Sequence, residues 1–147
     1  ITEKPLALSG EKAEELLALS KSSNSKVGLN FCYRYYPVMQ EAAARVRDNE
    51  VGQPNVVMGS YLQDWLFHDT DYSWRLKKGY AGESNAIADI GSHWCDLAQF
   101  VSGSEITEVM ADLETIIPVR KKSRDRVETF GGSESEKFED VEVDLEE

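Results

Sequence analysis

The chain has 147 residues, and 27 Asp and Glu against 16 Lys and Arg give it a formal net charge of −11. This acidity argues against nucleic acid or an anionic membrane as the main partner, and no apolar stretch is long enough for a membrane-spanning helix. The two cysteines, Cys32 and Cys95, are too few for a disulfide framework, so we expect a reducing, cytoplasmic setting.

The first part of the sequence predicts a strand, a helix and a second strand. Residues 1–5 are typical of the end of a strand that runs into a turn. Ser9 is a suitable N-cap for an amphipathic helix of about three turns, and residues 26–33 are rich in β-forming side chains. Strand, helix and strand at this short spacing indicate a βαβ unit with parallel strands.

The middle of the chain predicts two further helices with a strand and a long loop between them. Pro37 suits the first turn of a helix that continues to Arg47. Residues 55–63 form a predicted strand, and residues 64–85 form a long mixed loop of the kind that is often functional. Residues 86–101 have helical periodicity, so a helix is expected there.

The last part of the sequence predicts strands again. We expect a long strand over residues 106–119 and an edge strand over residues 138–145, with a turn at Gly131-Gly132. The basic run from residue 120 to residue 126 has no interleaved aromatic residues, which favours an exposed connection. Residues 134–147 hold eight acids and one lysine and are interpreted as a solvated strand or chain end.

One helical segment carries a polar stripe. Asp89 and His93 are four residues apart, and His93 and Asp96 are three apart, so the three side chains share a helix face. Three interpretations remain open from spacing alone: a surface ion pair, a metal site made of these three residues, and general acid–base catalysis. The last is chemically reasonable because the unperturbed pKa of histidine, about 6.5, lies near neutral pH.

A set of motifs, taken in order, resembles one known family. Glu3-Lys4-Pro5, the run Asn30-Phe31-Cys32-Tyr33-Arg34-Tyr35, Trp74-Arg75 and the run from Asp89 to Leu97 are similar to the glucose–fructose oxidoreductase/inositol dehydrogenase (Gfo/Idh/MocA) family. The resemblance implies an α+β fold with an open, mostly antiparallel sheet and helices on one face, preceded by a residual βαβ piece of a Rossmann domain. It assigns residues 1–33 to the end of the dinucleotide-binding domain and residues 34–147 to a truncated substrate-binding and dimerisation domain.

The resemblance also implies roles for individual residues. Lys4, with Glu3 and Pro5, would lie beside the nicotinamide of NAD or NADP, and its ammonium would stabilise charge on the reacting hydroxyl. Asp89 would orient the substrate and His93 would give or take a proton. Four further residues would contact substrate or serve packing, and no metal is expected. These four are Asn30, Arg34, Trp74 and Arg75.

The function that the resemblance implies is hydride transfer between NAD(P) and a hydroxyl of a sugar or cyclitol, so a small polyol or sugar is the expected partner. The Gly-x-Gly-x-x-Gly fingerprint that holds a dinucleotide is absent from the sequence. The chain is therefore expected to be an internal fragment that is inactive alone. The alternative is a non-catalytic binding or dimerisation module. With either function, the resemblance implies a homo-oligomer formed through the sheet face.

Overall fold

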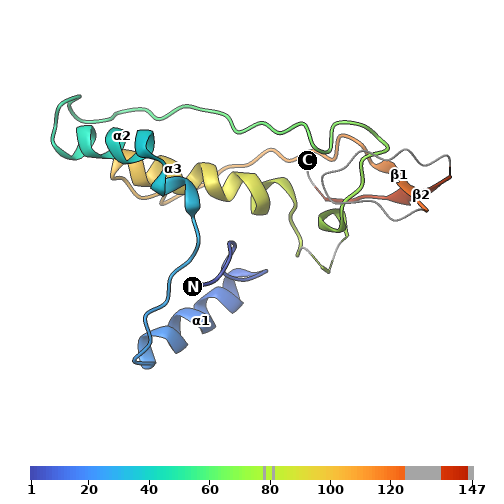
Figure 1. The fold of residues 1–147 in the computed structure, drawn as a ribbon, viewed down its shortest axis with the longest axis horizontal. Coiled ribbons are helices and arrows are strands. Elements are labelled where there is room, and N and C mark those ends of the chain that lie inside the picture. Colours follow the sequence, from blue (N-terminus) through green and yellow to red (C-terminus); the bar gives the residue numbers. More distant parts are fainter. Residues whose placement is uncertain (78, 81, 125–136, 146–147) are drawn as a thin grey trace. The chain divides into compact units, whose positions relative to one another are not determined.

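The computed structural model describes residues 1–77, 79–80, 82–124 and 137–145. These residues contain three α-helices and one antiparallel sheet of two strands, which confirms the α+β class (Figure 1). They divide into two compact units. Unit 1 comprises residues 1–61 and 88–111, and unit 2 comprises the described parts of residues 62–87 and 112–147. The proposed domain boundary after residue 33 stays a prediction.

Helix α1 (Gly10–Ser22) begins where the sequence predicts. The side chain of Ser9 accepts a hydrogen bond from the backbone N–H of Lys12, which satisfies one of the amide groups that a helix start leaves unpaired. Glu11 in the first turn and Lys21 in the last turn carry the charges that the helix dipole favours. Local sequence signals therefore suffice for this helix.

The parallel pairing on either side of α1 is present but much shorter than predicted. Thr2 and Leu29 form a single parallel bridge, in which Thr2 N–H donates to the Gly28 carbonyl and Asn30 N–H donates to the Thr2 carbonyl, each over 2.9 Å. The predicted strand over residues 26–33 does not form, because its last residues turn into the 3₁₀-helix η1 (Cys32–Tyr35).

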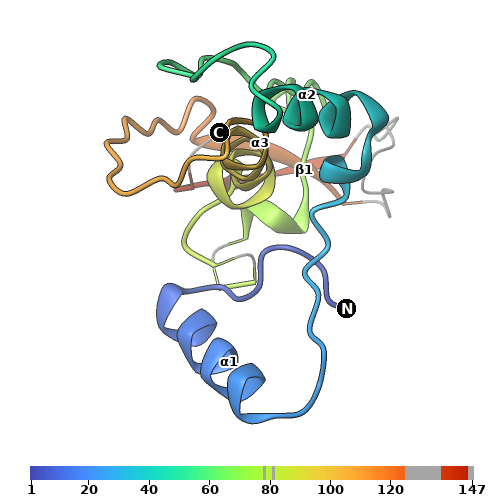
Figure 2. The ribbon, with the colours of Figure 1, turned by 90° about the vertical axis from the view of Figure 1, so that its left-hand side faces the viewer.

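Helices α2 (Pro37–Arg47) and α3 (Ser92–Ser102) lie against each other in unit 1 (Figure 2). Pro37 stands in the first turn of α2, as predicted, where its missing N–H costs nothing. Ala43 is buried, and η1 contacts both helices. The packing therefore brings η1, which follows the first bridge, to the helix that carries the polar stripe.

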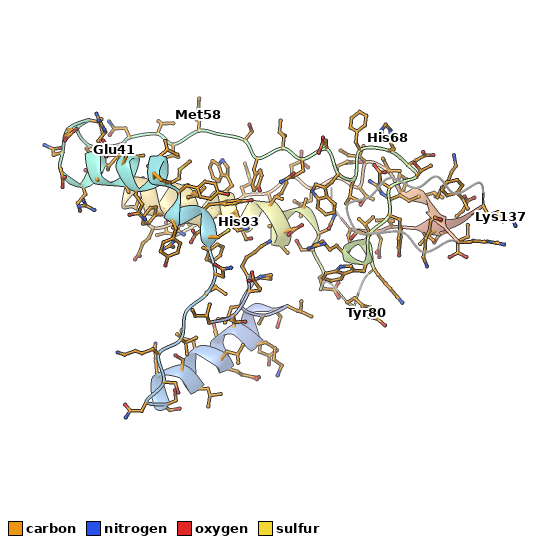
Figure 3. The ribbon with its side chains drawn as sticks, viewed as in Figure 1. Glu41, Met58, His68, Tyr80, His93 and Lys137 are labelled. Atoms are coloured by element: carbon orange, nitrogen blue, oxygen red, sulfur yellow. The ribbon has the colours of Figure 1, made fainter. Side chains whose placement is uncertain are left out.

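Two predicted strands are wrong. The structure assigns no strand to residues 55–63 or to residues 106–118. Alternating apolar residues favour a strand, but a strand also needs a hydrogen-bonded neighbour, and within the described residues neither segment pairs with one. Met58 points away from the helices (Figure 3). It is 87% exposed, and Met110 is 100% exposed.

Unit 2 is built on the sheet. Strand β1 (Val119–Ser123) pairs antiparallel with β2 (Phe138–Glu142), which confirms the edge strand predicted there. Leu76, Val143 and Leu145 form a small buried core, with Leu66 and Tyr72 packed against it. The predicted turn at Gly131-Gly132, and residues 134–136 and 146–147 of the acidic segment, lie outside the described residues.

The basic run is not simply an exposed connection. Arg120 lies in β1 and is only 1% exposed. Its guanidinium donates to the backbone carbonyls of Leu66, His68 and Asp71 over 2.8–2.9 Å. The expectation is wrong for this residue because a loop distant in sequence supplies three carbonyl oxygens, which accept the hydrogen bonds that a buried guanidinium needs to donate.

Candidate functional site

The polar stripe is carried by a continuous helical segment in two parts. A π-helical turn, η3 (Ile87–Gly91), leads directly into α3, because Gly91 keeps right-handed helical dihedral angles. Gly103 ends the segment in the left-handed conformation, with φ of 71°, which confirms the helix predicted over residues 86–101. π-turns inside α-helices are frequent at functional sites. Asp89 lies in this turn, whereas His93 and Asp96 lie in α3.

Lys4 reaches Asp89 from the other end of the sequence. Its Nζ lies 2.6 Å from Oδ1 of Asp89 and also donates to the Asp89 backbone carbonyl over 2.5 Å. The side chains are 14% and 23% exposed, so the pair is largely shielded from water. The structure thus brings together two of the three residues for which the resemblance implies catalytic roles, and both belong to unit 1.

His93 is one helical turn beyond Asp89 and is buried, with 7% of its surface exposed. Burial is the main cause that lowers the pKa of its imidazole below 6.5, and the ammonium of Lys4 lowers it further, while Asp89 and Asp96 act in the opposite direction. The ring is therefore neutral at pH 7. A neutral imidazole can take a proton from a hydroxyl.

The carboxylates do not bond to the imidazole as the stripe suggests. Asp96 forms a two-pronged pair with Arg34, in which Nε donates to Oδ2 over 2.8 Å and Nη2 to Oδ1 over 2.5 Å. The guanidinium of Arg34 also lies 5.2 Å from the centre of the Phe100 ring. Asp89 pairs with Lys4. Each carboxylate of the stripe therefore has its own cation.

The residues next to Lys4 are also linked. Asn30 Nδ2 donates to Oε1 of Glu3 over 3.0 Å, beside the Thr2–Leu29 bridge. Pro5 follows a cis peptide bond and is exposed. Glu3, Lys4 and Asn30 thus lie in one neighbourhood of unit 1, while their contact with a cofactor or substrate stays a prediction.

Trp74 and Arg75 belong to unit 2. They lie in the 3₁₀-turn η2 (Trp74–Leu76), whose N-cap Ser73 accepts a hydrogen bond from Arg75 N–H. The Arg75 guanidinium lies over the rings of Trp74, at 4.9 Å, and of Trp65, at 5.6 Å. Their predicted contact with substrate stays a prediction.

Two functional candidates were missed by sequence reasoning. The Tyr33 ring lies against His93 in a tilted arrangement with ring centroids 4.3 Å apart, and the hydroxyls of Tyr33 and Tyr61 are 2.6 Å apart. Tyr33 stands inside the Asn30–Tyr35 motif, so its position could have been noted. Tyr61 stood in a predicted strand and carried no signal of its own.

The described residues contain neither a metal-binding cluster nor a helix that could span a membrane. No group of three or more His, Cys, Asp or Glu side chains there is arranged to hold a metal ion. In the same part of the chain, no helix has both the length and the apolar character needed to cross a bilayer.

The fold and this cluster of an ammonium, a carboxylate and an imidazole define an α+β protein with a candidate acid–base site. Comparison with protein families identifies the family: residues 39–143 match the model described as the GFO/IDH/MocA C-terminal domain. The match covers most of the chain, so the chain belongs to this family, and the resemblance noted from its motifs is confirmed.

Individual relatives agree. A levoglucosan dehydrogenase from Pseudarthrobacter phenanthrenivorans is 36% identical over 82% of this chain and 30% of that protein. A glucose-6-phosphate 3-dehydrogenase from Bacillus subtilis is 22% identical over 96% of this chain and 42% of that protein. The crystal structure of an oxidoreductase domain protein from Kribbella flavida superposes with a TM-score of 0.83 and 34% identity, covering 98% of this chain and 37% of that one. The chain thus spans less than half the length of each of these relatives.

Proposed function

We propose that the protein is an oxidoreductase that transfers a hydride between NAD or NADP and a hydroxyl-bearing carbon of a sugar or polyol. The observation that carries the proposal is the placement of Lys4, Asp89 and His93 in one unit, with Lys4 and Asp89 in direct contact. The names of the relatives support a sugar or polyol, because they act on levoglucosan and glucose 6-phosphate.

Lys4, Asp89 and His93 have different roles, which follow from their charges. The Lys4 ammonium donates a hydrogen bond to the reacting oxygen and stabilises the negative charge that develops there. Asp89 holds that ammonium in place and accepts from a second substrate hydroxyl. His93, neutral at pH 7 because burial lowers its pKa, takes the hydroxyl proton as the carbon loses its hydride. The nicotinamide, when bound, accepts that hydride.

The chain fits the nicotinamide end of the cofactor better than the pyrophosphate end. Lys4 offers a shielded ammonium, but the 147 residues contain no Gly-x-Gly-x-x-Gly run. We therefore expect these 147 residues alone to bind NADH and NADPH weakly and to show no turnover. Isothermal calorimetry of the chain tests this expectation, and a micromolar dissociation constant would contradict it.

The activity test uses the complete product of the gene that encodes this chain. Levoglucosan, glucose and myo-inositol are offered with NAD⁺ and NADP⁺, and reduced nicotinamide is followed by absorbance. His93→Gln should lower kcat by about 10²- to 10⁴-fold, the usual contribution of general acid–base catalysis, while cofactor affinity is retained. His68→Gln is the matched control, since His68 lies in unit 2. Unchanged turnover in His93→Gln would remove His93 from the mechanism.

A second candidate function is a binding or dimerisation module. The extended segments of unit 1 expose large apolar side chains, among them Val56, Met58, Val109 and Met110. Such exposed apolar segments favour association with a second copy of the chain. Light scattering of the gene product and of its Met110→Lys variant tests this: a dimer that the charge weakens supports the proposal, and a monomer in both contradicts it.

The free thiols of Cys32 and Cys95 support a cytoplasmic location.

A further inference from the structure

The imidazole of His93 is held without a hydrogen bond to Nδ1. Within the described part of the chain, Nδ1 is a buried side-chain atom with no hydrogen-bond partner. In histidine acid–base sites, a hydrogen bond to one ring nitrogen ordinarily sets the orientation and tautomer of the ring. The two carboxylates that flank His93 on its helix face, Asp89 and Asp96, bind Lys4 and Arg34. The orientation of the ring must therefore come from other contacts.

Aromatic rings supply those contacts. The Tyr33 ring lies 4.3 Å from the imidazole, centroid to centroid, with the planes inclined by 34°. Phe31 meets the imidazole by its edge at 5.7 Å, and the Tyr61 ring lies at 6.4 Å. A ring that is covered by one inclined ring and in edge contact with another has little freedom to rotate, because interiors are packed too closely to leave room.

Tyr33 is itself fixed at its far end. Its hydroxyl lies 2.6 Å from the hydroxyl of Tyr61, which arrives from a different segment of unit 1. This hydrogen bond and burial raise the pKa of Tyr33 to about 12, so the phenol stays neutral over the working range of an enzyme. The bond between the two hydroxyls therefore persists from acid to mildly alkaline pH.

The turn that carries Tyr33 is fixed to the helix that carries His93. Tyr33 and Arg34 are neighbours in η1, and Arg34 binds Asp96 of α3 through two hydrogen bonds. Asp96 is three residues beyond His93 and buried. Planar two-pronged pairs of this kind hold direction as well as distance. Backbone and side chain of Tyr33 thus have separate attachments.

We propose that Tyr33, held by the Tyr61 hydroxyl, is the positioning residue that orients the imidazole of His93 for proton transfer. The inference rests on the proposed function, in which His93 handles the proton. Tyr33 acts through His93 and needs no contact with substrate. Its hydroxyl is engaged with Tyr61, and its ring provides the surface on which the imidazole lies.

The kinetic experiment compares variants of the complete gene product. Tyr33→Phe and Tyr61→Phe each remove the bond between the hydroxyls, and each should lower kcat roughly 3- to 10-fold, the effect of one hydrogen bond, with KM nearly unchanged. The double variant should fall no further than the more affected single variant, because one interaction is lost in both. Tyr35→Phe, an exposed tyrosine of the same turn, is the matched control and should keep full activity.

The spectroscopic experiment does not depend on turnover. The protein is labelled with ¹⁵N-histidine, and the ring signals of His93 are assigned by their loss in His93→Gln. Tyr33→Phe and Tyr61→Phe should displace the His93 ring signals in the same direction. Tyr33→Leu, which removes the aromatic ring, should displace them most. Tyr35→Phe should leave them in place. Tyr61→Phe keeps the test valid if a Tyr33 variant fails to fold.

The two proposals fail separately. If His93→Gln retains turnover, the proposed proton transfer by His93 is wrong, whatever the spectra show. If His93→Gln is inactive while the His93 signals and kcat are the same in Tyr33→Phe, Tyr61→Phe and the wild-type protein, the proposed role of Tyr33 is wrong. An additive loss in the double variant would also overturn it, because it would show that the two hydroxyls act independently.

Discussion

The ammonium of Lys4 lies 2.6 Å from the carboxylate of Asp89, although 85 positions separate the two residues in sequence. Lys4 precedes α1 and Asp89 lies in the π-turn before α3, so this contact joins the chain's first segment to the helix that carries His93. It places one positive and one negative charge within reach of the imidazole, and their effects on the His93 pKa oppose each other. Removing them singly should therefore shift that pKa in opposite directions.

Lys4→Met should raise the pKa of His93, because the ammonium lowers it in the wild-type protein. Asp89→Asn should lower that pKa, since the carboxylate raises it. An NMR titration of the histidine ring protons measures both shifts. Lys12→Met, which removes an exposed cation paired with Glu15 in α1, is the control and should leave the titration unchanged. Equal midpoints in Lys4→Met and the wild-type protein would contradict the prediction.

The stability of the protein should fall as the pH decreases below about 6.5, the ordinary pKa of histidine. The folded protein holds the pKa of His93 below that value, so between the two values the unfolded chain binds a proton that the folded chain does not. The stability that the neutral His93 contributes is therefore complete above pH 6.5. It is lost as the pH falls through the pKa that His93 has in the folded protein. One proton limits the slope to about 1.4 kcal/mol per pH unit.

Urea unfolding at a series of pH values measures this dependence. His93→Gln should flatten the curve over the interval just below pH 6.5, while His68→Gln should leave its shape as in the wild-type protein. A wild-type curve that is level between pH 7 and pH 5, or one that His68→Gln flattens equally, would count against the buried neutral imidazole.

Gly59→Ala should destabilise unit 1 by about 1–3 kcal/mol, the cost of forcing an extra methyl group into a packed contact. A Cβ at residue 59 would lie 2.9 Å from Nε1 of Trp94, so the indole or the backbone must shift. Gly10→Ala is the matched control, because a Cβ at residue 10 meets nothing within 4 Å. Chemical denaturation measures the stability of both variants. Trp94→Phe removes the crowded nitrogen, so adding it to Gly59→Ala should relieve part of the loss of stability.

Arg120→Met should lower the free energy of unfolding by about 2–4 kcal/mol, because it removes the hydrogen bonds from the buried guanidinium to the carbonyls of Leu66, His68 and Asp71. Arg120→Lys keeps the charge but not the geometry of the guanidinium, so its free energy of unfolding should lie between those of the wild-type protein and Arg120→Met. Lys122→Met in the same strand is the control: its exposed pair with Glu139 should contribute less than about 1 kcal/mol. Thermal unfolding compares the three, and equal losses in Arg120→Met and Lys122→Met would contradict the assignment.

Elements with local signals could be predicted from the sequence. Ser9 caps α1, Pro37 begins α2, and Gly103 ends α3, because each residue acts on backbone groups within a few positions. The extended segments around Met58 and Met110 could not be predicted in the same way. Their alternating pattern is that of a strand, but a strand exists only where another backbone pairs with it.

The candidate site divides in the same manner. Asp89, His93 and Asp96 share a helix face by periodicity, and the motifs selected Lys4. The partners of these residues were not predictable, since Arg34 reaches Asp96 and Tyr33 reaches His93 from a turn about sixty residues earlier. A pattern within one segment contains no information on which distant side chain will meet it.

By itself, then, the sequence determined where the main helices begin and end and which polar residues lie along one helical stripe. Only the tertiary structure decided that Lys4 pairs with Asp89, that Tyr33 covers His93 and that Arg120 is buried. The physical reason is range: caps and helical periodicity act over a few residues of one segment. Ion pairs, ring stacking and burial depend on the meeting of segments that are far apart along the chain.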